Sequence, residues 1–314
     1  MKTVIIVASI AAAVFLLIIA VCLYIPHFIF NFVFGKPKRS TKVPKSYKDS
    51  PHYKVSRKGM ELMKTYGCED VYITSRDGFK LHAYLFKAPN QPAKKFVLGI
   101  HGYKSYARPE YGPFIEFYRS LGYSMLLPDD RAHAPSEGKY IGFGVLDRLD
   151  CVDWSKYIVE RFGSDSQIYL HGVSMGSATV LAASGEEDLP VQVKGIIADC
   201  GYDSARNILA YQMKHTAHLP VKPFLSQCEA VCKKKAGFAF NEFTPVEQVK
   251  KAKVPILFIH GEDDTMVPVE MAHTLYDACA SKKKLLIVKN AKHAESIAIA
   301  PDEYRKTVRE FFNI

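Results

Sequence analysis

The stretch YLHGVSMGSATVLAAS, residues 169–184, changes character abruptly at its centre. Aromatic and β-branched residues typical of a buried strand lead into two glycines, and small helix-forming residues follow. Between the glycines lies Ser174, a polar residue at a sharp corner where packing alone does not favour one. The pentapeptide GVSMG (172–176) fits G-x-S-x-G, a turn from strand to helix that exposes a serine hydroxyl. Five residues are a weak signal alone, so the meaning of Ser174 depends on the rest of the chain.

The rest of the chain alternates between segments with strand character and segments with helical character. Apolar residues alternate in a hairpin pattern across residues 68–89, around a turn at 76–78. Further short strands are predicted at residues 96–100, 124–127, 168–171, 193–198, 256–259 and 285–288. Helical spacing separates them, as at residues 147–163, and a last helix is predicted at 301–314. This order predicts a largely parallel sheet covered by helices on both faces.

A serine at the carboxyl edge of such a sheet would meet side chains from the loops that follow other strands. Asp263 and Asp264 follow the predicted strand PILFIH, and His293 follows the predicted strand KKLLIVKN. A serine hydroxyl needs a base to accept its proton and a third group to orient that base. We therefore assign Ser174 as the nucleophile, His293 as the general base and then acid, and Asp264 as the carboxylate that holds the imidazole.

Five segments resemble the α/β-hydrolase superfamily in sequence and in order: GIHGY (99–103), PDDRAHAPSEG (128–138), GVSMG (172–176), HGEDDTMVP (260–268) and KHAES (292–296). The resemblance covers about residues 68–314. It is greatest to a membrane-anchored bacterial branch grouped with serine aminopeptidase-like hydrolases, whose members are mostly esterase-like. It implies an α/β-hydrolase fold with a mostly parallel eight-stranded sheet, helices on both faces and a small helical cap. It also implies cleavage of carboxylic esters through an acyl-enzyme intermediate.

The resemblance further implies roles for individual residues of the site. In this family the aspartate four residues after the histidine of the HG pair usually completes the triad, which matches Asp264 rather than Asp263. The backbone N–H groups of Tyr103 and Met175 are expected to form the oxyanion hole, which stabilises negative charge on the attacked carbonyl oxygen.

The segment PDDRAHAPSEG (128–138) is expected to brace the loop beneath the site. The residues that would do so, by hydrogen bonds and ion pairs as in relatives, are Asp129, Arg131, His133 and Ser136. The alternative for His133 is a role as a second catalytic histidine.

The first 35 residues differ in kind from the rest of the chain. No charged residue occurs from Val4 to Ile25, and a helix over that stretch would extend about 33 Å, close to the hydrocarbon thickness of a bilayer. We predict one transmembrane helix within residues 1–35 that serves as an uncleaved anchor. A cleaved signal peptide is the alternative, although its apolar region is usually shorter. Aromatic residues after Pro26 suit the interfacial zone of a membrane.

The formal net charge of +10 is concentrated beside this predicted anchor. Residues 36–58 contain nine Lys or Arg against one acidic residue, Asp49, and are predicted to form a basic juxtamembrane linker. The predicted hydrolase domain, residues 59–314, is nearly neutral overall, which argues against a nucleic-acid partner. Basic residues are attracted to anionic lipid and stay on the cytoplasmic side. We therefore expect a single-pass membrane protein whose catalytic domain faces the cytoplasm.

A long connection separates the strands predicted at 193–198 and 256–259. It is too long for a simple loop, and its apolar residues are interrupted by Pro220 and Pro223. We predict a mainly helical cap at about residues 201–250, lying over the catalytic edge of the sheet.

Three functions remain open from the sequence. The first is an anchored serine hydrolase that cleaves small, lipid-like or other carboxylic esters. The second is an amidase or peptidase with the same triad, because neither the cap nor the handling of an amine leaving group can be read from the sequence. The third is a membrane-tethered binding protein without catalysis, against which the complete Ser174, Asp264 and His293 set argues. Seven cysteines without a C-x-x-C pair favour reduced thiols, and without an HExxH or phosphate-binding motif we expect no metal and no cofactor.

Overall fold

The computed structural model describes residues 2–37, 48–89, 93–133 and 135–314. Eight strands form one sheet in the order β1-β2-β4-β3-β5-β6-β7-β8. Their bounds are β1 Glu69–Thr74, β2 Lys80–Phe86, β3 Lys95–Ile100, β4 Ser124–Pro128, β5 Gln167–Val173, β6 Val193–Asp199, β7 Ile256–Gly261 and β8 Lys283–Val288. Strand β2 pairs antiparallel with β1 and β4, and the remaining pairs are parallel. The fold is that of an α/β hydrolase, as predicted.

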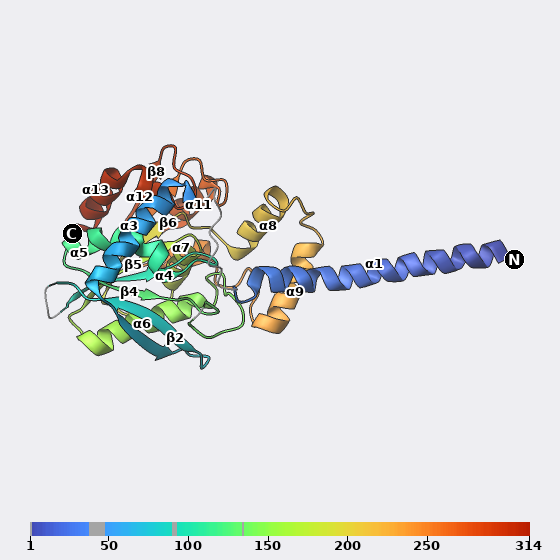
Figure 1. Cartoon of the computed structure of the whole chain (residues 1–314), viewed down its shortest axis with the longest axis horizontal. Coiled ribbons are helices and arrows are strands. Elements are labelled where there is room, and N and C mark those ends of the chain that lie inside the picture. The colour runs from blue at the N-terminus through green and yellow to red at the C-terminus, as the bar shows by residue number, and fades with distance from the viewer. Residues whose placement is uncertain (1, 38–47, 90–92, 134) are drawn as a thin grey trace.

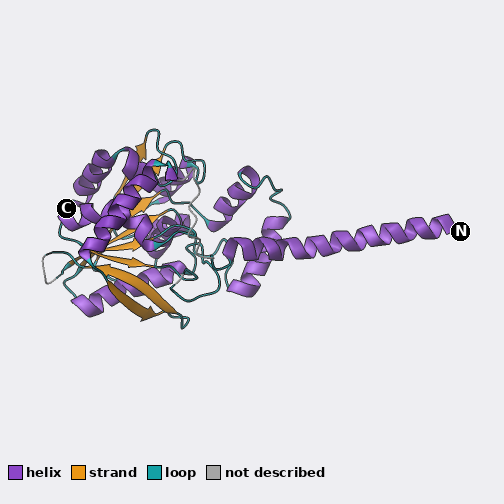
Figure 2. Ribbon diagram, viewed as in Figure 1, coloured by secondary structure: helices purple, strands orange, loops and turns teal. Residues whose placement is uncertain are grey.

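The sheet has an apolar layer on each face, because side chains alternate between the two faces along a strand. On β3, Phe96 and Leu98 belong to one buried cluster, whereas Val97 belongs to the other. Helices α6 (Asp147–Phe162), α7 (Met175–Ala183) and α11 (Val269–Ala278) contribute Trp154, Leu181 and Leu275 to the first cluster. The second cluster lies under α3 (Pro51–Tyr66), α4 (Ala107–Tyr111), α5 (Ile115–Ser120), α12 (Ser296–Ile299) and α13 (Pro301–Phe312). Figure 2 shows the strands enclosed between these layers.

The connection between β6 and β7 is mainly helical. It contains α8 (Ala205–His215), α9 (Phe224–Ala236), α10 (Pro245–Gln248) and a short 3₁₀ turn, Val249–Lys251. Helices α8 and α9 stand apart from the sheet, and α9 contacts the helix at the N-terminus (Figure 1). A third buried cluster forms there, and it includes Phe238 and Phe240 from this connection.

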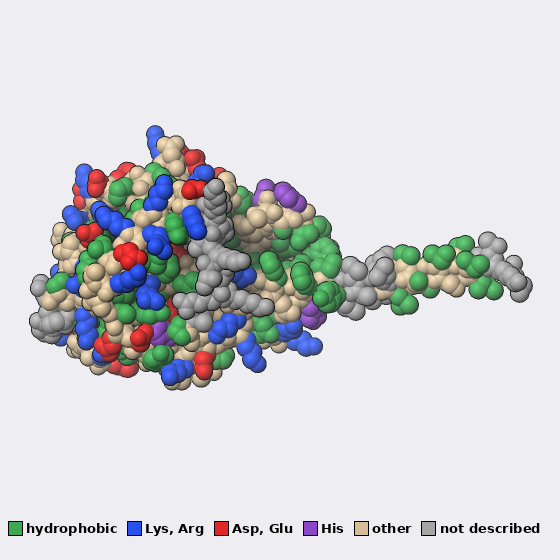
Figure 3. Space-filling view, in the orientation of Figure 1, with side chains coloured by type: hydrophobic (Ala, Val, Ile, Leu, Met, Phe, Trp, Pro, Cys, Tyr) green, Lys and Arg blue, Asp and Glu red, His purple; other side chains and the backbone are tan. Residues whose placement is uncertain are grey.

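The first helix, α1 (Lys2–Phe34), has two parts with different surroundings. Large apolar side chains near its start are exposed, with Val4 at 72% and Leu16 at 65%. At its other end Phe30 and Phe34 are completely buried in the third cluster. Apolar side chains therefore gather along the described part of α1 and where it meets the connection between β6 and β7 (Figure 3).

The structure gives no support to the predicted transmembrane helix. Among the residues that are described, no helix combines the length and the apolar character needed to cross a membrane. The end of the predicted anchor also packs on protein, since Phe30 and Phe34 lie against α9 and neighbouring segments.

The predicted linker at residues 36–58 is corrected in its second part. Residues 38–47 lie outside the described residues, but residues 51–58 form the first half of α3. This helix packs closely on the body, because a Cβ on Gly59 would lie 1.9 Å from the carbonyl oxygen of Gly112. Its buried positions are His52, Ser56, Gly59 and Met63. Three of these four positions are small or polar and only Met63 is a large apolar residue, so the segment shows little apolar periodicity. Its exposed basic residues favour the linker prediction.

Candidate active site

Ser174 lies on a sharp turn between β5 and α7. Its backbone has φ 56° and ψ −115°, a conformation that L-residues rarely adopt. Two glycines allow the turn: a Cβ on Gly172 would lie 2.2 Å from the carbonyl oxygen of Gly176, and a Cβ on Gly176 would lie 1.8 Å from that of Ile100. The N–H of Ser174 donates to the carbonyl oxygen of Asp199 at 2.8 Å. The hydroxyl is thereby held beyond the carboxyl ends of the central strands.

His293 and Asp264 converge on this hydroxyl from the loops after β8 and β7. The Ser174 hydroxyl and His293 Nε2 are 2.9 Å apart, and His293 Nδ1 lies 2.7 Å from Oδ2 of Asp264. A carboxylate can only accept, so Nδ1–H donates to Asp264 and Nε2 accepts from Ser174. The neighbouring Asp263 is exposed and bonds through its backbone N–H to Ala291. The geometry thus brings together the three residues that the sequence singled out and leaves Asp263 outside.

Asp264 is fixed by bonds to both carboxylate oxygens. Its Oδ1 accepts the backbone N–H groups of Met266 and Val267 at 2.8 and 2.9 Å. His260 Nε2 lies 3.3 Å from Oδ2, on the same oxygen as His293. Burial opposes the charged form, but the hydrogen bonds from His260 and His293 outweigh it and hold the pKa of Asp264 well below its usual range. The group therefore remains a carboxylate over the whole neutral range.

His293 is set between opposing influences. Burial lowers the pKa of its imidazole, whereas the hydrogen bond to Asp264 and the charge of that carboxylate raise it, and the net shift is upward. Its side chain is 16% exposed, so it faces solvent at one edge while Asp264 is enclosed. An imidazole oriented in this way can accept a proton from Ser174 and later release it to a leaving group.

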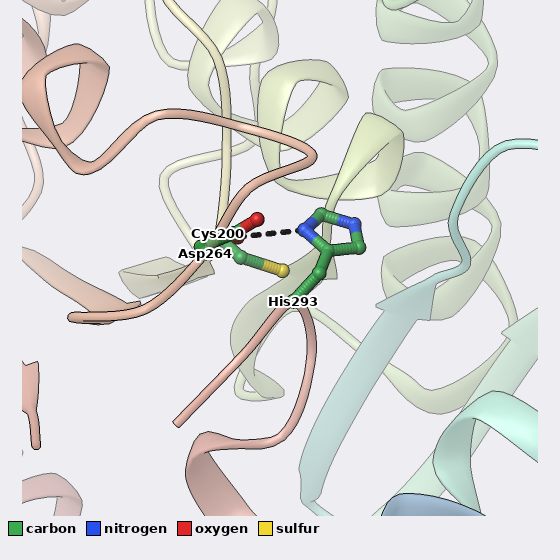
Figure 4. A group of neighbouring side chains, drawn as sticks. All are labelled: Cys200, Asp264 and His293. Atoms are coloured by element: carbon green, nitrogen blue, oxygen red, sulfur yellow. Dashed lines mark hydrogen bonds and ion pairs between the residues drawn. The ribbon is translucent and has the colours of Figure 1, made fainter. Parts of the chain in front are cut away.

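A buried thiol that the sequence did not single out borders this group. Cys200 directly follows β6, and its sulfur and the ligand atoms of Asp264 and His293 all lie within 4.8 Å of one another. Figure 4 shows the three side chains directed toward one another, with the bond between Asp264 and His293. Burial raises the pKa of the Cys200 thiol well above its usual value, so it stays protonated, and a protonated thiol is a poor metal ligand. A lone cysteine after a strand carries no sequence signal that would have predicted this position.

Tyr103 and Met175, the residues predicted to supply the oxyanion hole, both belong to segments that adjoin Ser174. Met175 is the first residue of α7, where backbone N–H groups have no partner within the helix. Tyr103 follows Gly102, and a Cβ on Gly102 would lie 3.3 Å from Cβ of Ser174. Among the hydrogen bonds of the described residues, none uses the backbone N–H of Tyr103 or Met175 as donor. Both N–H groups are thus left without an acceptor in the described part of the chain, in residues adjacent to Ser174 and to Gly102.

The loop after β4 is held by a polar network. The guanidinium of Arg131 donates to both carboxylate oxygens of Asp150, at 2.6 and 2.7 Å, and to Asp77 at 2.8 Å. Ser136 donates to the carbonyl oxygen of Asp129 at 2.5 Å. His133 is buried and its Nδ1 lies 3.1 Å from the carbonyl oxygen of Arg131, within its own loop. These contacts fit the bracing role predicted for the loop, and His133 makes no hydrogen bond to Ser174, Asp264 or His293 among the described residues.

Comparison with known proteins gives a family that agrees with this geometry. The family model described as the prolyl oligopeptidase family matches residues 144–313, which contain Ser174, Asp264 and His293. This chain belongs to the prolyl oligopeptidase family. The membership, together with the esterase structure below, supports serine hydrolase activity on esters or peptides.

This family member is similar to proteins of Bacillus subtilis, Escherichia coli and Pyrococcus furiosus. It is 30% identical over 200 residues to the uncharacterized protein YqkD of Bacillus subtilis, a match covering 64% of this chain and 65% of that one. It is 22% identical over 253 residues to the uncharacterized protein YfhR of Escherichia coli O157:H7, covering 78% and 81% of the two chains. A crystal structure of the Pyrococcus furiosus esterase Pf2001 superimposes with a TM-score of 0.66 at 25% identity, covering 89% of this chain and 97% of that one.

Proposed function

We propose that this family member hydrolyses carboxylic esters, with Ser174 as nucleophile, His293 as general base and acid, and Asp264 as the orienting carboxylate. One observation carries the proposal: the two hydrogen bonds of 2.9 and 2.7 Å that link Ser174 to His293 and His293 to Asp264. Such a linked set is what a serine hydroxyl needs to become a nucleophile near neutral pH.

The proposed reaction has two halves. The hydroxyl oxygen of Ser174 attacks the ester carbonyl carbon while Nε2 of His293 takes the proton. Negative charge on the carbonyl oxygen is stabilised by the backbone N–H groups of Tyr103 and Met175. The intermediate collapses to an acyl-serine, and His293 gives its proton to the departing alcohol. Water then attacks the acyl carbon while Nε2 of His293 takes a proton from it. The second intermediate collapses to a carboxylic acid, and His293 returns the proton to the oxygen of Ser174.

The nucleophile is tested by labelling with a fluorophosphonate probe, which reacts with activated serines. The wild type is expected to label at one site, Ser174→Ala is expected not to label, and Ser184→Ala is expected to label as the wild type does. Ser184 is a matched control because it lies at the end of the same helix, and its hydrogen-bond partners among the described residues belong to that helix. A wild type that does not label, or a Ser174→Ala variant that does, overturns the proposal.

An amidase or peptidase reaction is the second candidate, favoured by the family whose model matches residues 144–313. The same residues would serve, but His293 would have to protonate an amine. The likeness to the esterase Pf2001 favours esters. A panel of p-nitrophenyl esters of increasing acyl length, run against aminoacyl anilides, separates the two. Ester turnover exceeding anilide turnover across the panel supports our proposal, and the reverse ratio replaces it with the peptidase.

We also propose that residues 1–35 associate with a membrane and that the hydrolase domain lies on its cytoplasmic side, within reach of lipid-like esters. The support is the row of exposed apolar side chains on α1, among them Val4, Ile10 and Leu16. Contact of such apolar surface with water is unfavourable, so it favours burial in lipid or protein. The nine basic residues within 36–58 support the cytoplasmic side. Flotation of the full chain with phosphatidylcholine vesicles tests association, with the double variant Val7→Lys, Ile10→Lys expected to stay unbound. Equal flotation of both chains, or digestion of the domain by protease added outside intact cells, contradicts this proposal.

A further inference from the structure

The C-terminal turn of α1 bonds directly to the loop that carries Tyr103. The Tyr103 hydroxyl donates to the carbonyl oxygen of Val33 at 2.8 Å, and Nζ of Lys104 donates to that of Phe32 at 2.7 Å. The last carbonyl groups of a helix have no partner within the helix, so they are available as acceptors. A lysine ammonium is also favoured at this negative end of the helix. Two neighbouring side chains of one loop therefore bond to the C-terminal end of one helix.

The loop that contains Tyr103 and Lys104 is conformationally constrained and borders the nucleophile. Lys104 has φ 53°, in the left-handed region, so the chain turns sharply directly after Tyr103. Before it, His101 is fully buried, and its Nε2 accepts the backbone N–H of Asp130 at 3.0 Å. Gly102 between them lies against Ser174. The backbone N–H of Tyr103 is thus held from one side by His101 and from the other by the bonds to α1.

The helix end is itself fixed to the body of the protein. Gly35 forms a β-bridge with Tyr140, and the N–H of Ile141 donates to the carbonyl oxygen of Phe34 at 2.8 Å. The rings of Phe34 and Phe143 are 4.8 Å apart, and those of Phe143 and Tyr103 are 5.2 Å apart. This chain of contacts makes the end of α1 a firm support for the loop.

The second oxyanion residue contacts the same assembly. The side chain of Met175 is fully buried in the cluster that contains Phe30 and Phe34 of α1 and Phe143. Both residues whose backbone N–H groups border Ser174 are therefore tied through their side chains to structure that includes the end of α1.

We propose that the C-terminal turn of α1 is a positioning element for the oxyanion hole, and that Tyr103 and Lys104 are positioning residues that hold its loop through the carbonyl groups of Val33 and Phe32. This inference rests on the proposed serine hydrolase function. It assigns to the side chain of Tyr103 a task separate from that of its backbone N–H, and it gives the N-terminal helix a part in the reaction.

The test uses the full chain and the variants Tyr103→Phe and Lys104→Met, which remove one donor each and keep the side-chain bulk. An oxyanion hole acts on the transition state, so each variant is expected to lower kcat for a p-nitrophenyl ester about tenfold and to change KM less than twofold. The affinity for an alkyl boronic acid, which forms a tetrahedral adduct on the serine, is expected to fall in parallel with kcat. Lys104→Arg keeps a donor and is expected to restore most of the activity.

Lys235→Met is the matched control. Lys235 also touches α1, since its Nζ lies 3.4 Å from Oδ1 of Asn31, but it does so from α9 and not from the loop. Its loss is expected to leave kcat unchanged. The inference is overturned if Tyr103→Phe and Lys104→Met match the wild type in kcat, if KM rises while kcat holds, or if Lys235→Met lowers kcat equally. Failure of the proposed function is distinguishable, because the wild type would then not label at Ser174.

Discussion

Two histidines of this molecule are built into similar acid–base groups, and only one of them meets a nucleophile. His293 donates through Nδ1 to the buried Asp264 at 2.7 Å, and His82 donates through Nδ1 to the buried Asp129 at 2.9 Å. The other ring nitrogen of His293 faces Ser174 at 2.9 Å, whereas that of His82 faces Asp70 at 2.8 Å. The carboxylate–histidine pair is thus the same in both places. The partner of the second nitrogen differs: a serine hydroxyl fits His293 for catalysis, and a second carboxylate fits His82 for a structural role.

Position in the sheet explains the difference in partners. His82 lies within β2, where its neighbours are strand residues, and a carboxylate on each nitrogen makes the ring a charged brace. Burial lowers the pKa of His82, but the bonds to Asp129 and Asp70 outweigh it and raise the pKa above its usual value. His293 lies in a loop at the carboxyl edge, where parallel strands direct their following residues toward one site.

The largest contrast is expected when each carboxylate becomes an amide. Asp264→Asn is expected to lower kcat on the order of 10⁴-fold, because an amide no longer holds the tautomer in which Nε2 can accept the proton of Ser174. Steady-state kinetics with a p-nitrophenyl ester measure the loss, and circular dichroism verifies folding. Asp129→Asn is the matched variant and is expected to keep kcat within about threefold per folded molecule. A comparable loss of kcat in both variants would remove the distinction between the two groups.

A smaller effect is expected from pH. His293 must be neutral to accept a proton, and its pKa is raised by Asp264 relative to 6.5. Below that pKa, kcat/KM is expected to rise about tenfold per pH unit, with a midpoint above 6.5. Asp264 does not contribute to this limb, because its own pKa lies well below its usual range. Measuring kcat/KM from pH 5 to 9 gives this midpoint. A midpoint below 6.5 would contradict the arrangement described for His293.

The smallest effect on activity is expected from His82→Gln, whose effect falls on stability. Leaving Asp129 buried without its charged partner is expected to lower the free energy of unfolding by about 3–5 kcal/mol. Because folding raises the pKa of His82, its stabilisation is fully present below pH 6.5 and is lost as the pH rises through the folded pKa. Urea unfolding of both chains at several pH values measures this difference. A gap in stability that widens with rising pH would argue against the charged brace.

Both groups also show what the sequence can and cannot predict. The strands, the closing helix and the convergence of Ser174, Asp264 and His293 followed from apolar patterns and motif order, since the topology of a parallel sheet brings the loop ends together. The His82 brace was predicted only on one side: Asp129 belongs to the segment 128–138 that was expected to brace the loop, whereas His82 and Asp70 lie in the hairpin and belong to no motif.

The contacts of α1 could not be predicted for a related reason. Tyr103 and Lys104 bond to backbone carbonyl groups about 70 positions earlier, and a backbone acceptor leaves no trace in residue type. Helix α3 was missed because, apart from Met63, its buried positions are small or polar and form no apolar stripe. Sequence patterns therefore predicted the sheet and its motifs, whereas the contacts that hold the loops depend on backbone groups and on residues far apart in the chain.

The two glycines that flank Ser174, Gly172 and Gly176, have a consequence for the evolution of this chain. A methyl group on Gly176 would collide with the carbonyl oxygens of Ile100 and His101, at 1.8 and 2.8 Å, and so would push β3 and the following loop away from α7. Ser174 has no such duty, since only its hydroxyl is needed for chemistry. Descendants that lose catalysis are therefore expected to keep the glycines, and to replace the serine only with a residue that tolerates its backbone conformation at φ 56°. A pseudoenzyme of this lineage is recognisable by an intact G-x-x-x-G frame around a residue other than serine.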